Sequence, residues 1–110
     1  MSESASQIAQ LNDLLRTTFL TGKVVLTPGI YTLPEGVREL VLSEVREFTG
    51  FNEDNDPQGE HDFGSIDVAG VGAVFWKIDY YNPTLDAGSS DPSDPAKTTR
   101  VLTVMLALEY

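Results

Sequence analysis

The sequence contains no cysteine, which excludes disulfide bonds, thiolate metal sites and cysteine nucleophiles. Basic side chains are also scarce, because 7 lysines and arginines stand against 17 aspartates and glutamates, giving a net charge of −10. This charge argues against direct binding to nucleic acid or to anionic membranes, since like charges repel and no basic cluster can replace counterions. It favours a basic partner or a cation.

Long apolar runs are missing as well. No stretch approaches the roughly 20 apolar residues of a membrane span, and the first ten residues, MSESASQIAQ, lack the basic start and apolar centre of a secretory signal. We therefore expect a cytoplasmic protein without membrane contact. A chain of 110 residues, 41% of them hydrophobic, has room for a single domain, residues 1–110, with its own core.

Apolar residues at helical spacing predict two helices. The first runs from Ala5 to Leu20 and has its apolar stripe at Ile8, Leu11, Leu15 and Phe19, while its opposite, exposed face carries Asn12, Asp13 and Arg16. The second begins near Pro34 and ends at Gly50, with its buried stripe at Val37, Leu40, Val41, Val45 and Phe48. Between the helices, we expect Lys23–Thr27 to be a short strand and Ile30–Thr32 to pair back with it after the Pro28-Gly29 turn.

The second half of the chain is typical of strands and loops. Phe63–Val68 and Ala73–Tyr81 flank a Gly-Val-Gly turn and predict a hairpin, and Asn82–Ala96 is a long proline-rich loop. In the second strand of this hairpin, one face is apolar and holds Val74, Trp76, Ile78 and Tyr80. The segment Thr98–Tyr110 fits either a helix or a strand, and we favour a strand because it is rich in β-branched residues. The predicted fold is α+β, a small antiparallel sheet of about four strands with two helices packed on one face.

The turn before the hairpin collects most of the candidate metal ligands. Its oxygen-bearing side chains resemble the spacing of a calcium-binding loop, at Asp54, Asp56, Gln58 and Asp62 with a glycine at Gly59. The bidentate glutamate that closes such a loop is replaced by Ser65. A transition-metal site would use Glu60, His61 and Asp62, with Asp79 or Asp91 as a further ligand.

The same turn holds the candidate catalytic residues. His61, the only histidine, stands between Glu60 and Asp62, and a histidine held by a carboxylate is the usual arrangement of a general base. Asp79 is the fourth candidate if the fold brings it close. A turn histidine that only ties down its loop gives the same pattern. No phosphate-binding loop or nucleophile motif is present, and no cofactor is expected.

The strongest strand supplies the candidate partner-binding residues, Trp76, Lys77, Asp79 and Tyr81. Aromatic side chains on a strand are first of all packing residues, because they bury large areas. If they are exposed beside Lys77 and Asp79, they form a patch of the kind that anchors partners.

Three segments, NDPQGEHDFG, VFWKIDYY and GSSDPSDPAKTTRVLTVMLALEY, resemble an uncharacterised family of alphaproteobacterial domains of unknown function. The matching positions include Asn55, Asp56, Gly59, Glu60, His61, Asp62, Phe63, Gly64, Trp76, Lys77, Asp79 and Tyr80. The resemblance implies a bacterial intracellular protein, often carried with mobile DNA, and it implies no activity.

Three functions follow from these features. The first is an acidic, non-catalytic interaction module that contacts a basic or nucleic-acid-binding protein, with one variant being a mobile-element inhibitor that offers a host defence nuclease a DNA-like acidic surface. The second is a small metal-dependent or His/Asp-based hydrolase that uses the Glu60-His61-Asp62 turn. The third is a purely structural role for that turn. The oligomeric state does not follow from the sequence.

Overall fold

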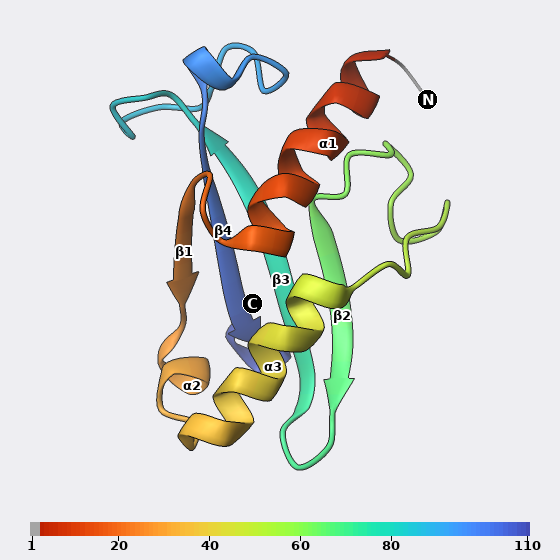
Figure 1. Cartoon of the computed structure of the whole chain (residues 1–110), viewed down its shortest axis with the longest axis vertical. Helices are drawn as coiled ribbons and strands as arrows, with labels where there is room; N and C mark the ends of the chain where they lie inside the picture. Colours follow the sequence, from red (N-terminus) through yellow and green to blue (C-terminus); the bar gives the residue numbers. More distant parts are fainter. Residues whose placement is uncertain (1–2) are drawn as a thin grey trace.

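The computed structural model describes residues 3–110 (Figure 1). In chain order, its elements are α1 (Glu3–Thr18), β1 (Lys23–Leu26), α2 (Pro28–Tyr31), α3 (Glu35–Glu47), β2 (Phe63–Val68), β3 (Gly72–Tyr81), the 3-10 turn η1 (Pro95–Lys97), β4 (Thr99–Leu106) and the 3-10 turn η2 (Ala107–Glu109). The four strands form one sheet in the order β1-β4-β3-β2. The fold is therefore α+β, as expected. Among these helices, none is both long and apolar enough to cross a membrane.

The sheet is mostly antiparallel. β2 and β3 form the expected hairpin, with Phe63 opposite Lys77. β3 and β4 also pair antiparallel, which confirms a strand in the last segment as far as Leu106, whereas Ala107–Glu109, expected to continue it, form the 3-10 turn η2. β1 differs, because it runs parallel to β4 with Lys23 opposite Val101, so the sheet is mixed.

The residues after β1 explain this parallel pairing. The segment Ile30–Thr32 does not form the expected returning strand, because the N–H groups of Ile30 and Tyr31 both donate to the carbonyl of Thr27 and close the helical turn α2. Pro28 favours that turn, since its ring fixes φ near the helical value. The chain then continues into α3 and leaves β1 at the edge of the sheet.

The core lies on the Trp76 face of the sheet. In Figure 1, α1 and α3 lie in front of the sheet. Phe48, directly after α3, meets the Trp76 ring edge-on at a centroid distance of 5.6 Å. As expected, β3 alternates, with Val74, Trp76 and Ile78 buried. The core consists of Leu15, Ile30, Val41, Val45, Val68, Val74, Trp76, Ile78, Leu102 and Val104.

The helices differ from expectation in which side chains they bury. Asn12 and Arg16, expected on the exposed face of α1, are only 0% and 3% exposed. Asn12 lies four residues after Ile8 and three before Leu15, so it occupies the same helical stripe as these core residues. Conversely, Leu40 of α3 was expected to be buried and is 48% exposed.

Candidate functional site

The loop between α3 and β2 uses its polar side chains to bind its own backbone. Asn52 Oδ1 accepts a hydrogen bond from the Asp54 N–H at 2.8 Å. The Asp56 carboxylate accepts hydrogen bonds from the N–H groups of Glu60 and His61, at 3.1 and 3.3 Å. Such side-chain turns are common for asparagine and aspartate. Asp56, a candidate metal ligand, therefore holds the loop in shape.

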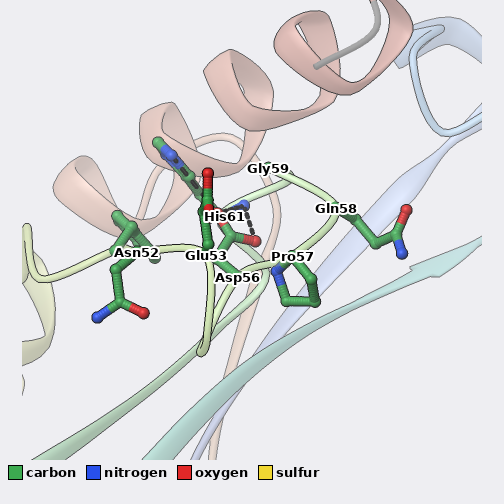
Figure 2. A pocket seen from close by; sticks show the side chains of 8 residues that line it. Asn52, Glu53, Asp56, Pro57, Gln58, Gly59 and His61 are labelled. Carbon is green, nitrogen blue, oxygen red and sulfur yellow. Dashed lines mark hydrogen bonds and ion pairs between the residues drawn. The ribbon is translucent and has the colours of Figure 1, made fainter.

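His61 is fixed by residues distant in the sequence. Its Nδ1 lies 3.0 Å from Oδ2 of Asp13 in α1, and its Nε2 lies 3.7 Å from Oδ2 of Asp56. The imidazole stacks on the Phe51 ring at 3.9 Å between centroids, with the planes 1° apart. Both residues line a hollow of about 330 Å³. Figure 2 shows Asp56 beside His61, with the side chains of Asn52 and Gln58 pointing outward toward opposite ends.

The side chains of His61 and its neighbour Glu60 contact different parts of the protein. Consecutive side chains leave the chain in different directions, so Glu60 accepts a hydrogen bond from the Tyr80 hydroxyl at 2.9 Å while His61 turns to α1. Asp79, the fourth candidate, pairs with Lys77 Nζ at 2.6 Å. In the described part of the chain, Asp79 makes no ion pair or hydrogen bond with His61. His61 is thus oriented by Asp13, a residue absent from the predicted set.

The candidate metal ligands do not converge. Within residues 3–110, no group of three or more histidine, cysteine, aspartate or glutamate side chains is placed to hold a metal ion. This applies to both predicted sets, which comprise Asp54, Asp56, Glu60, His61 and Asp62, with Asp79 or Asp91 as a further ligand. The reason is visible in the loop, where Asp54 is exposed and Asp56 faces backbone N–H groups.

A buried polar network joins α1 to the ends of β3 and β4. Asn12 Nδ2 donates to the Glu60 carbonyl at 2.9 Å and to the Tyr80 hydroxyl at 2.8 Å, while its Oδ1 accepts from Arg100 Nε at 2.7 Å. The Arg100 guanidinium also lies over the Tyr80 ring, 5.2 Å from its centroid. Burial raises the pKa of Tyr80, which keeps the phenol protonated as the donor to Glu60. All polar groups of Asn12 are therefore used.

Arg16 forms the second buried connection. Its Nη1 donates to the carbonyls of Val45, Arg46 and Phe48 at the end of α3, at 3.0, 3.2 and 2.9 Å. Its Nη2 donates to Asp13 at 3.0 Å, the carboxylate that also holds His61. The guanidinium carbon lies 5.1 Å from the centroid of the Trp76 ring. Arg16 thus caps α3 and links the core to the His61 turn.

The ionised carboxylate of Asp62 destabilises the folded chain. Its burial raises the pKa of the carboxyl above the ordinary 3.8, and the nearby Glu60 charge adds to this rise. A carboxyl with a higher pKa in the folded chain loses stability as the pH rises from the ordinary value through the folded one. We expect Asp62→Asn to increase the free energy of unfolding at pH 7, with the gain disappearing below about pH 3.8.

Urea unfolding at pH 7 and at about pH 3.5, on either side of the titration, measures this difference. The matched control is Asp54→Asn in the exposed part of the same loop, which should change stability little at either pH. A loss of stability at neutral pH in Asp62→Asn would show that its carboxylate is favourably solvated in the folded chain.

The predicted partner-binding residues separate into two groups. Trp76 is fully buried, so the expectation that it contacts a partner conflicts with its position in the core. Lys77, Asp79 and Tyr81 alternate with it and lie on the opposite face of β3. Tyr81 is 36% exposed there, and these three residues remain predicted partner contacts.

Asn12, Asp13, Arg16 and Arg100 are missing from the predicted site. Only the spacing of Asn12 and Arg16 within the apolar stripe of α1 pointed to their burial. Nothing local marks Asp13, because its contact with His61 spans 48 residues.

Comparison with known proteins adds one match. The model of a family described as a protein of unknown function (DUF3768) matches residues 26–109. The match begins at the end of β1, so α1, which supplies Asn12, Asp13 and Arg16, lies before it. No curated protein and no solved structure matches the chain.

Proposed function

Because this chain belongs to the DUF3768 family of proteins of unknown function, we propose a function from its own surface, that of an acidic, non-catalytic module that binds a basic protein partner. The placement of its charges carries this proposal. Two of the 7 basic residues, Arg16 and Arg100, are buried at 3% and 5% exposure. Of the 17 acidic side chains, that of Asp56 is comparably enclosed, at 6% exposure, and that of Asp62 is half-buried. With Asp56 left out, five basic side chains stand against 16 acidic ones that are exposed or partly exposed.

The basic side chains are fewer at the surface because some of them are used in contacts with the protein itself. The planar guanidinium groups of Arg16 and Arg100 sit at the end of long side chains and donate hydrogen bonds to backbone carbonyls inside the protein. One of the remaining cations, Lys77, is neutralised by Asp79. A strongly one-signed surface attracts partners of opposite charge and repels others, so it favours both rapid association and selectivity for basic proteins.

The contacts of the His61 turn support a non-catalytic role. The imidazole is used in stacking on Phe51 and in pairing with Asp13, and the Glu60 carboxylate is used by Tyr80. The Asp13 contact ties the loop to α1 and the Tyr80 contact ties it to β3, while the Phe51 stack lies within the loop itself. Together they favour a turn that shapes the acidic surface.

The class of partner that we propose is a nuclease with a basic groove. The family resemblance implies a bacterial intracellular protein that is often carried with mobile DNA, and for such a protein we propose a host defence nuclease as the partner. An inhibitor that presents carboxylates in place of phosphates would occupy the basic groove of such a nuclease.

Affinity capture tests this function. We expect the immobilised chain to retain a basic nuclease or DNA-binding protein at about 50 mM salt and to release it near 0.5 M, because salt screens surface charges. Double-stranded DNA added as a competitor should release the same protein. Retention of the captured protein at high salt, or capture of no basic protein, would contradict the proposal.

The alternative is a His/Asp-based hydrolase. It is favoured by one observation, the 3.0 Å contact between Asp13 and His61 Nδ1 beside an open hollow. A carboxylate in this position orients a general base. Ester or phosphoester hydrolysis that is lost in a folded His61→Ala variant would establish this alternative and overturn the non-catalytic module.

A further inference from the structure

β2 is an edge strand with unused backbone groups. It lies at one end of the strand order and pairs with β3 only. The N–H of Ile78 donates to the carbonyl of Asp62, so these two residues form a hydrogen-bonded pair of the antiparallel ladder. Hydrogen-bonded pairs alternate along such a ladder, so the next ones are Gly64 with Trp76 and Ile66 with Val74. The backbone groups of Phe63, Ser65 and Asp67 therefore point away from β3, and within residues 3–110 no other segment pairs with them.

A groove runs beside this edge. It is a hollow of about 330 Å³ between the C-terminal half of α3 and β2, lined by Glu44, Glu47, Phe48, Ile66 and Asp67. Three of these side chains are carboxylates and two are apolar. None of its lining residues, within the part of the chain that the structure describes, is basic. Arg46, which precedes Glu47 in α3, has its guanidinium over the Phe19 ring. The groove thus combines an apolar floor with a negative rim.

We propose that the β2 edge and this groove together bind an extended, lysine- or arginine-bearing segment of the partner by strand addition. The inference rests on the proposed function and gives it a location. A strand added to β2 would gain backbone hydrogen bonds from Phe63, Ser65 and Asp67. Every second side chain would point to the Ile66 face, where an aliphatic stem lies on the apolar floor and its charge reaches the carboxylates.

Charge favours a basic partner over a second copy of this chain. Two β2 edges placed side by side would bring both sets of Glu44, Glu47 and Asp67 together, and like charges across an interface oppose association. The other edge, β1, is less suited, because it is only four residues long and begins with Lys23. The acidic edge is therefore the one assigned to the partner.

The probe is an acetylated and amidated heptapeptide of alternating lysine and valine, titrated into the isotope-labelled full chain at low salt. We expect amide NMR shifts concentrated on Phe63, Ser65 and Asp67 and on the end of α3. A peptide of alternating glutamate and valine should give no such shifts. Absence of β2 shifts with the lysine peptide would overturn the assignment.

Two variants separate the backbone from the charge contribution. Ser65→Pro removes an outward N–H that no other segment uses, a position where an edge strand tolerates proline. Glu47→Lys reverses one charge of the rim, and Glu39→Lys makes the same change at an exposed site earlier in α3. We expect about tenfold weaker peptide binding in Ser65→Pro and Glu47→Lys and less than about twofold in Glu39→Lys.

The outcomes distinguish this inference from the proposed function. If lysine peptide or captured partner binds Ser65→Pro and Glu47→Lys as tightly as the parent, the β2 site is wrong while the acidic module stands. If no basic peptide or protein binds anywhere, the module fails as well. If the free chain is a dimer that Ser65→Pro dissociates, the occupant is a second copy and the partner assignment is overturned. Circular dichroism confirms that each variant is folded.

Discussion

Replacing Arg16 with methionine is expected to lower the free energy of unfolding by about 3 kcal/mol, because each buried carbonyl left without a donor costs roughly 1–3 kcal/mol. Arg16 serves the carbonyls of Val45 and Phe48, and it is 3% exposed, so water cannot replace it fully. Methionine retains much of the aliphatic volume against Trp76. The loss therefore reports mainly on the hydrogen bonds that hold α1 to the end of α3.

The control for this prediction is Arg46→Met, the same change in a half-buried residue of α3. The Arg46 guanidinium lies 4.9 Å from the centroid of the Phe19 ring, and such a contact is worth about 0.5–1 kcal/mol at an exposed site. Urea unfolding of both variants gives the comparison. Similar losses in the two variants would mean that Arg16 acts only as a packing residue.

Replacing Asn12 with leucine is expected to cost about 3 kcal/mol as well, although the two side chains are close in size. Leucine cannot serve the Glu60 carbonyl, the Tyr80 hydroxyl or Arg100 Nε, and a buried polar group without a partner is costly. Tyr80 keeps its bond to the Glu60 carboxylate, which limits the loss.

Gln10→Leu on the exposed side of α1 is the matched control, and it should change stability by less than about 0.5 kcal/mol. A stable Asn12→Leu protein would show that the network adds specificity of packing without adding net stability. Amide exchange of the Glu60–Asp62 segment adds a local readout. It should accelerate in Asn12→Leu, because the Glu60 carbonyl loses its tie to α1.

The sheet was largely predictable because its strands carry local signals. The alternation of β3 and the Gly-Val-Gly turn determine the hairpin, and β-branched residues distinguish the last segment as a strand. The helical turn after β1 is not evident from the sequence, because β-branched and aromatic residues such as Ile30 and Tyr31 favour strands. Pro28 has the opposite influence, since its fixed φ favours the first position of a helix.

The candidate site was less predictable for a physical reason. A sequence pattern assigns polar residues to the surface, whereas Asn12 and Arg16 are buried because each finds partners in segments 29 or more residues away. His61 was recognised as a special residue, but its partner Asp13 depends on how α1 lies against the loop. The neighbouring Glu60 does not share this partner, because its carboxylate accepts a hydrogen bond from the Tyr80 hydroxyl.

These contacts form one connected arrangement. Arg16 and Asp13 link the end of α3 to His61, and Asn12 links His61's neighbour Glu60 to Tyr80 and Arg100. The two buried arginines thus stabilise the fold from inside, whereas all carboxylates except that of Asp56 remain at least partly exposed.

The most direct test of the acidic module with its binding site at β2 is the affinity of the captured partner for the purified chain at two salt concentrations. We compare the parent with a variant that carries Glu44→Gln, Glu47→Gln and Asp67→Asn. The account predicts that parent affinity falls at least about tenfold between roughly 50 and 200 mM salt, and that the variant binds more weakly with a smaller salt dependence. Equal affinities for parent and variant, unchanged by salt, would contradict it.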